Sequence, residues 1–294
     1  MAKANAKRIE AGKGGAKSPT AAPAAGPAPK VRTATLLRMK REGRRITCAT
    51  AYDWPSALAL ERAGIDVCLV GDSLGQVVLG YESTLPVTLD EMLHHARAVK
   101  RGLTRALLVV DLPFMSYQLG PAQALASAGR LLKECGAEAV KLEGGAEVAA
   151  SVEALRLAGV AVLGHIGLTP QSVHALGGYR VQGRERAAAA RLLADARALE
   201  RAGACAVVLE GLPGALAGRI TRALAIPTIG IGAGPLCDGQ VQVWHDILGA
   251  LPHAAPRHAR AYASQFSEQV RALSAFAGEV RQGSFPSARE TPAP

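Results

Sequence analysis

The 294-residue sequence lacks the features that mark membrane and exported proteins. No apolar run reaches the roughly 18 residues that a bilayer-spanning helix needs. The N-terminal segment is basic, but it has no apolar central stretch of the kind found in secretory signals. We therefore expect a cytoplasmic protein with no membrane partner.

Cysteine is also scarce, and the few that occur are scattered. The chain has five cysteines and no CxxC pair; they are Cys48, Cys68, Cys135, Cys205 and Cys237. An odd, dispersed set argues against both a disulfide framework and a zinc site. We expect most of these side chains to be small buried hydrophobic groups.

The net charge of +10 is concentrated at the N-terminus, where residues 1–30 hold six Lys or Arg and one Glu. This segment consists mainly of Ala, Pro, Gly and Lys and cannot form a core, so we predict a disordered basic tail. A nucleic-acid-binding arm is the alternative, but no aromatic residue interleaves the lysines as a stacking platform would require. We expect no nucleic-acid partner. Residues 283–294 are predicted to form a second disordered tail.

Between these tails, short β-branched runs alternate with longer segments rich in Ala, Leu and Arg, which is typical of βαβ units and a parallel sheet. The predicted strands are 45–52, 66–71, 106–112, 138–143, 160–166, 205–210, 226–231 and 241–247. The predicted helices are 54–63, 89–101, 121–135, 147–157, 185–202 and 214–224, with Thr88 and Glu91 forming a capping-box pattern.

Eight strands within about 250 residues match a (β/α)₈ barrel, and a doubly wound open sheet is the alternative. We predict one catalytic domain over residues 31–282. Its last part, 257–282, is predicted to form one or two amphipathic helices outside the repeat, packed on the barrel or on a neighbouring subunit.

Acidic residues recur where the predicted strands end, at Asp72, Asp111, Glu143 and Glu210. In a parallel barrel, reactive groups project from these carboxyl ends. His165 lies near the end of a fifth strand. We therefore expect these side chains to meet at one mouth of the barrel.

Lys141 and Glu143 are two residues apart, so on a strand they face the same side. Apolar neighbours indicate that this side is the barrel interior. Interior charges are costly unless they are paired or bound to a metal. A structural ion pair explains one such strand, but it explains four acidic strand ends poorly.

Each residue also has a purely structural interpretation. These are a helix cap for Asp72, an Asx turn for Asp111, an ion pair with Lys141 for Glu143, a loop-backbone contact for Glu210 and a satisfied core position for His165. Asp53, before Trp54 and Pro55, is predicted to cap a helix and not to act in catalysis.

The ligand chemistry indicates the metal. Carboxylates without a Cys/His cluster suit Mg²⁺, which takes one or two carboxylates together with water and substrate oxygens. A 2-oxo acid supplies such oxygens, and its chelation stabilises the enolate formed when a neighbouring C–H bond is deprotonated. Lys141 would add positive charge beside that oxygen.

The glycines of GIGAG, Gly230, Gly232 and Gly234, invite a dinucleotide-binding interpretation. The spacing is wrong, because GxGxxG requires a glycine at position 235, which is Pro235. A loop that faces a phosphate or a cofactor stays open as an alternative.

At these positions the sequence resembles the ketopantoate hydroxymethyltransferase (3-methyl-2-oxobutanoate hydroxymethyltransferase) family. The matching runs, in order over residues 45–250, are TAYD, LVGDSLG, STLPVTLDEM, DLPFMSY, VKLEGG, GHIGLTPQSV, GGYRVQGR, VLEGLP and IPTIGIGAG with CDGQVQVWHD. The basic tail and the region after Asp246 depart from the family pattern, which leaves folate contacts and subunit packing open.

The resemblance implies a (β/α)₈ barrel of the phosphoenolpyruvate/pyruvate type. It also implies Mg²⁺-dependent transfer of a hydroxymethyl group from 5,10-methylenetetrahydrofolate to 3-methyl-2-oxobutanoate, giving 2-dehydropantoate for pantothenate and coenzyme A synthesis. A large homo-oligomer, a decamer, is expected.

The resemblance also assigns roles to individual residues. Asp72 and Asp111 correspond to Mg²⁺ ligands, and Glu143 to a further metal-site carboxylate that acts directly or through water. The substrate contacts are Asp72, Ser73, Asp111, Lys141 and His165. Glu210 corresponds to the proton acceptor.

A lyase or mutase that acts on 2-oxo acids, such as an isocitrate lyase relative, is the second enzyme interpretation. Relatives that cleave carbon–carbon bonds place a reactive Cys in a loop after a mid-barrel strand. Here that loop reads EGGAEV. A non-enzymatic, nucleic-acid-binding protein rests on the tail alone.

Overall fold

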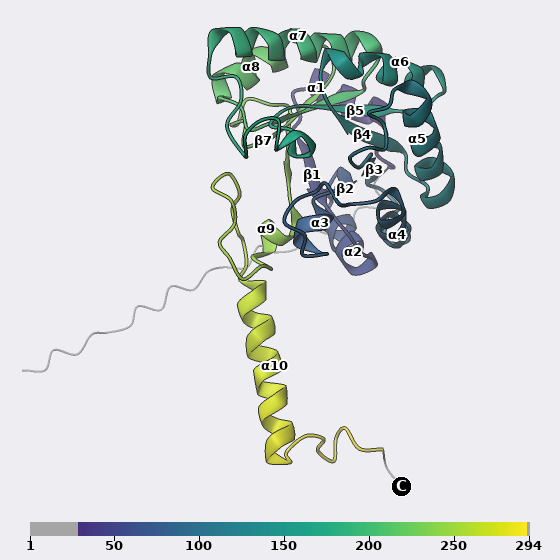
Figure 1. Cartoon of the computed structure of the whole chain (residues 1–294). Coiled ribbons are helices and arrows are strands. Elements are labelled where there is room, and N and C mark those ends of the chain that lie inside the picture. The colour runs from purple at the N-terminus through teal and green to yellow at the C-terminus, as the bar shows by residue number, and fades with distance from the viewer. Residues whose placement is uncertain (1–28, 293–294) are drawn as a thin grey trace, which may run out of the picture.

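A computed structural model describes residues 29–292 and forms a closed barrel of eight parallel strands in the order β1 to β8 (Figure 1). The strands are β1 Ile46–Thr50, β2 Val67–Val70, β3 Leu107–Asp111, β4 Ala139–Glu143, β5 Val162–Gly167, β6 Ala206–Glu210, β7 Thr228–Ile231 and β8 Gly239–Gln242. The predicted (β/α)₈ barrel is confirmed, and a doubly wound open sheet is excluded because β8 pairs with β1.

The first seven predicted strands agree with the structure to within two residues at each end. The eighth prediction, 241–247, is wrong: β8 is Gly239–Gln242, and Trp244–Leu248 form the short helix α9. The strand begins at a glycine because a Cβ at position 239 would clash with the Ile46 carbonyl of β1. The chain leaves the sheet where the Trp244 backbone N–H donates to Thr50 Oγ1 at 2.8 Å.

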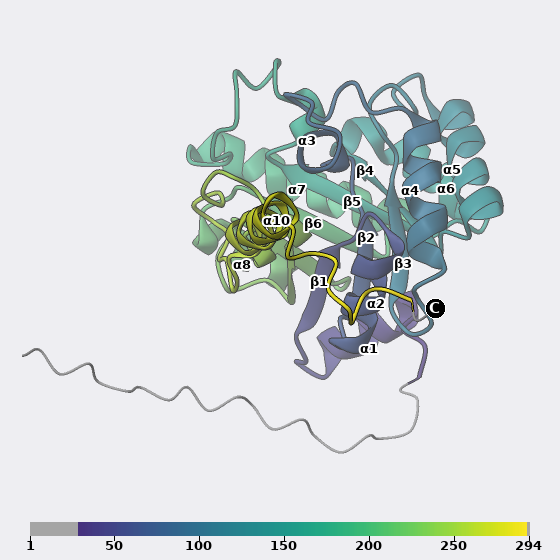
Figure 2. The same cartoon turned by 90° about the horizontal axis from the view of Figure 1, so that it is seen from below.

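Helices lie between the strands and cover the outside of the barrel, and the last helix, α10, projects away from it (Figures 1 and 2). They are α1 Thr33–Arg41, α2 Trp54–Arg62, α3 Leu74–Val77, α4 Leu89–Lys100, α5 Pro121–Cys135, α6 Ala149–Leu157, α7 Arg186–Ala202, α8 Gly214–Ala223 and α10 Gln265–Gln282, with 3₁₀ turns η1 Ala146–Val148 and η2 Pro170–Ser172. The six predicted helices are all present, while α1 and α3 were not predicted.

Two predicted helix caps are confirmed. Thr88 and Glu91 form the capping box of α4. Asp53 caps α2, since its Oδ1 accepts a hydrogen bond from Ser56 N at 2.7 Å. Asp53 therefore has the structural role that the sequence indicated.

The barrel interior is apolar below its mouth. Leu36 and Met39 of α1 pack with inward-facing strand residues and close the amino end of the barrel. The inward residues of the strands are mainly aliphatic; they include Ile46, Leu69, Val109, Ala139, Leu163, Val208 and Ile229. Four cysteines are buried and Cys205 is half-buried, and all five are free thiols. The expectation that most cysteines are small buried groups is confirmed.

The C-terminal helix α10 projects away from the barrel (Figure 1). None of its residues is buried. It carries exposed apolar side chains at four- and three-residue spacings, namely Phe266, Val270, Leu273, Phe276 and Val280. Such a stripe marks one face of an amphipathic helix. The structure has one helix here, where one or two were predicted.

The predicted N-terminal tail lies outside the described residues except for positions 29 and 30. Lys30 belongs to the fold: its Nζ donates to Ala106 O at 2.7 Å and to Glu138 Oε2 at 2.6 Å. Within residues 29–292, no helix combines the length and apolarity needed to cross a bilayer. The cytoplasmic location and the lack of a nucleic-acid partner stay predictions.

Candidate active site

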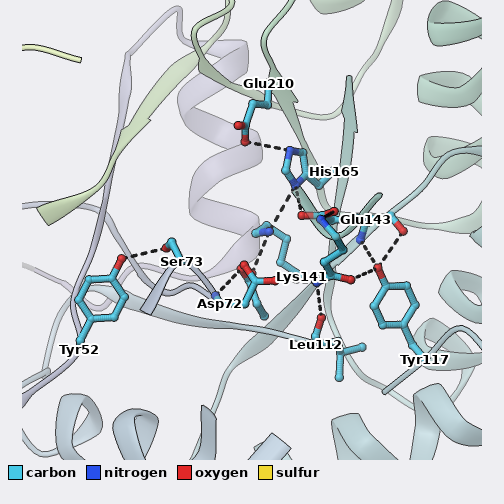
Figure 3. Close-up of polar contacts among 11 residues, drawn as sticks. Tyr52, Asp72, Ser73, Leu112, Tyr117, Lys141, Glu143, His165 and Glu210 are labelled. Atoms are coloured by element: carbon cyan, nitrogen blue, oxygen red, sulfur yellow. Dashed lines mark hydrogen bonds and ion pairs between the residues drawn. The ribbon is translucent and has the colours of Figure 1, made fainter. Parts of the chain in front are cut away.

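Parallel register brings the predicted charged residues together at the carboxyl end of the barrel. Asp111 of β3 is paired with Lys141 of β4, and Glu143 of β4 is paired with His165 of β5. Glu210 ends β6 opposite Gly167 of β5. Because alternate residues of a strand face the same side, Lys141 and Glu143 both point into the mouth (Figure 3).

Gly167 is required for the close approach of β5 and β6 at this point. Its φ is +101°, and a Cβ there would clash with the carbonyl oxygen of Glu210. Glycine alone combines this backbone conformation with the missing side chain. The carboxyl end of β6 can therefore lie directly against β5.

Lys141 is the central cation of the mouth. Its Nζ lies 3.0 Å from Asp111 Oδ1, with both side chains buried. Burial by itself lowers the pKa of Lys141, but Asp111, Glu143 and Asp72 outweigh this effect and raise the pKa above its ordinary value. The ammonium group is therefore charged at neutral pH.

His165 lies between two carboxylates. Its Nδ1 is 3.3 Å from Glu143 Oε1, and its Nε2 is 3.3 Å from Glu210 Oε2 (Figure 3). Burial and the charge of Lys141 oppose protonation of the ring, but the two carboxylates prevail and raise the pKa of His165 to about 9. The position of His165 between Glu143 and Glu210 therefore favours the protonated ring.

Asp72 is buried, and within residues 29–292 no cationic side chain is in contact with it. Its Oδ2 accepts a hydrogen bond from Gln171 Nε2 at 2.8 Å, and its backbone N–H donates to Asp111 Oδ2 at 3.1 Å. Burial, followed by the charges of Asp111 and Glu143, raises the pKa of Asp72 well above its ordinary 3.8. Burial also raises the pKa of Asp111, against the opposing effect of Lys141.

The contacts of these residues differ from those that the purely structural interpretations of the sequence predicted. Asp72 makes no cap bond to α3, Asp111 Oδ2 accepts from a residue 39 positions away, and Lys141 is paired with Asp111 in place of Glu143. The carboxylate of Glu210 faces His165, which is itself surrounded by charge and is not an isolated core histidine.

Ser73 lies at the edge of this cluster. Its Oγ is 2.9 Å from the hydroxyl of Tyr52, which is buried in the core (Figure 3). The Tyr52 backbone carbonyl is in turn 2.6 Å from His95 Nδ1. Ser73 is thus anchored to β1 and α4, next to Asp72 in the chain. Its role as a substrate contact stays a prediction.

Two buried residues, Tyr117 and Gln171, were not predicted to belong to the site. The Tyr117 hydroxyl lies 2.7 Å from Gln171 Oε1 and accepts from the Glu143 backbone N–H at 3.0 Å. Gln171 lies in η2, in the loop after β5. Both residues occur in family-like runs, DLPFMSY and TPQSV, and that resemblance was the one available signal for them.

The mouth suits a hard divalent cation. Four carboxylates face one Lys and one His, and Asp111 Oδ1 is a buried oxygen whose ion pair with Lys141 lacks hydrogen-bond geometry. Within residues 29–292, no three acidic, His or Cys side chains converge closely enough to hold one ion by themselves. Mg²⁺ does not require this, because water and substrate oxygens complete its shell.

The sequence is similar to those of one family of known proteins. A family model described as ketopantoate hydroxymethyltransferase matches residues 30–288. The 3-methyl-2-oxobutanoate hydroxymethyltransferase of Thermoanaerobacter sp. (strain X514) is 54% identical over 257 residues, covering 87% of this chain and 94% of that protein. The protein of the same name from Moorella thermoacetica is 57% identical over 251 residues, covering 85% and 93%.

Solved structures with lower sequence identity share the barrel. Phosphoenolpyruvate phosphomutase from Streptomyces platensis subsp. rosaceus has a TM-score of 0.57 at 17% identity, covering 90% of this chain and 92% of that one. The structure of 2,3-dimethylmalate lyase, a member of the PEP mutase/isocitrate lyase superfamily, has a TM-score of 0.54 at 19% identity. The match covers 90% of this chain and 93% of that one. These proteins share the (β/α)₈ barrel fold with this chain.

The uncompensated charge of Asp72 generates a prediction about stability. We expect Asp72→Asn to raise the melting temperature of the chelator-treated protein by roughly 2–4 °C, or about 1 kcal/mol, because a buried like charge is removed. The pKa of Asp72 is raised above 3.8, so the wild type loses stability relative to the variant as pH rises above that value. The gain, measured by calorimetry, should be larger at about pH 8 than at about pH 5.

Asp111→Asn is the matched control, because it leaves the buried Lys141 without its partner at 3.0 Å. This variant should have a lower melting temperature than the wild type. A decrease for Asp72→Asn at both pH values would show that its charge is already compensated in the metal-free protein.

Proposed function

Because the chain belongs to the ketopantoate hydroxymethyltransferase family, we propose that it transfers a hydroxymethyl group from 5,10-methylenetetrahydrofolate to 3-methyl-2-oxobutanoate with the help of Mg²⁺. The enzyme class is that of its relatives, a 3-methyl-2-oxobutanoate hydroxymethyltransferase. The product, 2-dehydropantoate, would serve pantothenate and coenzyme A synthesis. The observation that carries the proposal is the cluster of three buried carboxylates and the partly exposed Glu210 around Lys141 and His165.

Asp72 and Asp111 would hold Mg²⁺, with Glu143 as a further carboxylate that acts directly or through water. When bound, Mg²⁺ supplies a Lewis acid for the keto and carboxylate oxygens of the oxo acid. Lys141 is held beside Asp111 and stays charged, so it would stabilise negative charge on the same substrate oxygens. Ser73 would contact the oxo acid, and His165 would orient it.

Glu210 would act as the general base. Its carboxylate takes the proton from C3 of the oxo acid, and the electron pair of that C–H bond forms the enolate. The enolate carbon then bonds to the methylene carbon of the donor. One C–N bond of the donor would break as the C–C bond forms, and that nitrogen would receive the proton held by Glu210. Water would then replace the second nitrogen, giving its hydroxyl to the methylene carbon and its proton to that nitrogen, so that tetrahydrofolate leaves. His165 Nε2, 3.3 Å from Glu210 Oε2, would place positive charge beside the base.

The proposed activity can be tested with the purified protein, 3-methyl-2-oxobutanoate and 5,10-methylenetetrahydrofolate. We expect formation of 2-dehydropantoate, its loss after chelation and its recovery when Mg²⁺ is restored. Product formation that is unaffected by chelation would reject the metal requirement alone. A lack of product with Mg²⁺ present would reject the proposed donor or substrate.

The role of Glu210 can be tested by exchange of the C3 proton in deuterated water. We expect Glu210→Gln to slow this exchange by about 10²- to 10⁴-fold, since a general base is lost, while the oxo acid still binds. Glu143→Gln is the comparison, because it changes a predicted metal-site carboxylate and should weaken metal binding as well. Exchange at the wild-type rate in Glu210→Gln would assign the base elsewhere.

We further propose that the protein forms a homo-oligomer and that the apolar stripe of α10 contributes to it. Helix α10 projects from the barrel with Val270, Leu273 and Phe276 exposed. An apolar face of this kind on a projecting helix favours burial against another surface. The family resemblance implies a decamer.

Light scattering after gel filtration tests this assembly. We expect the wild type to exceed the mass of one chain, and the double variant Val270→Asp with Leu273→Asp to have a lower mass, because charges would enter an apolar interface. Arg271→Ala, which removes an exposed ion pair with Glu268 on the same helix, should leave the mass unchanged. A monomeric wild type would contradict the assembly, and an unchanged double variant would exclude α10 from it.

A further inference from the structure

Gln171 is a buried amide that connects three strand ends of the active site. Its Nε2 donates to Asp72 Oδ2 at 2.8 Å, after β2, and to Leu112 O at 3.0 Å, after β3. Its backbone N–H donates to Glu143 Oε2 at 2.9 Å, at the end of β4. One residue from the loop after β5 thus holds two of the predicted metal-site carboxylates.

The orientation of this amide is fixed by its other contacts. Gln171 Oε1 accepts from the Tyr117 hydroxyl at 2.7 Å and from Gln118 Nε2 at 3.1 Å. The opposite orientation would place Oε1 against Asp72 Oδ2 and Leu112 O, where acceptor would face acceptor. The Tyr117 hydroxyl is held in turn by the Glu143 backbone N–H. The network therefore permits one arrangement, with the amide donors facing Asp72.

Gln171, a neutral hydrogen-bond donor, affects the carboxylates of the mouth differently from the cation Lys141. Lys141 neutralises part of the charge of Asp111, whereas Gln171 holds Asp72 and Glu143 in place and leaves their charges intact. Gln171 bonds one oxygen of each carboxylate, while Glu143 Oε1 lies 3.3 Å from His165 Nδ1 and Asp72 Oδ1 is left for another partner. Two carboxylates are thereby held in fixed positions at the mouth by a partner that brings no positive charge.

We propose that Gln171 is a positioning residue that orients Asp72 and Glu143 before the metal binds and so sets the metal affinity of the site, with Tyr117 fixing the Gln171 amide. This inference rests on the proposed Mg²⁺ dependence. A merely structural Gln171 would affect the stability of the loop after β5 but not the affinity of the mouth for a cation.

Mn²⁺ titration of the metal-free full-length protein, followed by calorimetry or electron paramagnetic resonance, tests the proposal. Gln171→Met keeps the length of the side chain and removes its donors. We expect it to raise the Mn²⁺ dissociation constant by about 10- to 100-fold, the range found when partners of metal ligands are lost. Tyr117→Phe removes the hydroxyl that holds the Gln171 amide. It should also raise the Mn²⁺ dissociation constant, but by a smaller factor.

Gln123→Met is the matched control. Gln123 is a glutamine of α5, and its amide donates to Met115 O and accepts from Leu119 N, outside the charged cluster. The Mn²⁺ dissociation constant of this variant should equal that of the wild type. Melting temperatures of all metal-free variants separate a folding defect from a change in affinity.

The possible outcomes distinguish this inference from the proposed function. If the wild type binds Mn²⁺ and Gln171→Met binds it equally well, the positioning role is rejected and the metal site stands, whatever the melting temperature. If Gln171→Met does not fold, Tyr117→Phe decides in the same way. A wild type that binds no Mn²⁺ would reject both the metal requirement and the role of Gln171.

Discussion

Strand register in the closed barrel is the constraint on which the active site depends. Register sets Asp111 beside Lys141 and Glu143 beside His165, and it places Glu210 against Gly167. A shift of one residue in any of these strands would turn its charged side chains outward, because side chains alternate with a period of two. The apolar interior below the mouth strengthens every interaction among these charges, since it excludes water. The packing of the barrel and the electrostatics of its mouth are therefore inseparable.

The charges that register brings together are unbalanced. Lys141 and His165 offset part of the negative charge of four carboxylates, and Asp72 has no cation in contact. A protein optimised for stability alone would replace such a group with an apolar residue. Gln171 contacts two of these carboxylates with a neutral amide, whereas an Arg or Lys in its place would neutralise them. The excess of negative charge at the mouth is therefore kept. The arrangement is therefore understandable as preparation for a ligand that brings its own positive charge.

Much of this architecture was predictable from the sequence because it depends on local patterns. Seven strands and the acidic residues at their ends follow from hydrophobic runs and from the rule that barrel chemistry lies at carboxyl ends. The boundaries of β8 were wrong because Gly239, a weak strand former, is required by contact with Ile46. Gln171 and Tyr117 carry no local signal of function, since their importance arises from contacts with residues 28 to 99 positions away along the chain for Gln171 and 26 to 54 for Tyr117. Such contacts exist only after the barrel has closed.

The same contacts favour Glu210 over Glu143 as the proposed proton acceptor. Both residues end strands, and both face His165. Glu143 has its Oε2 on the Gln171 N–H and its Oε1 beside His165, and its side chain is 3% exposed. Protonation of Glu143 would weaken bonds that hold the mouth together. Glu210 has one oxygen beside His165, and its side chain is 17% exposed. It can therefore receive a proton from a substrate at the mouth without disturbing the hydrogen-bond network of Gln171. These contacts support the proposal that Glu210, which has fewer protein contacts, is the base and that Glu143, which has more, supports a cation.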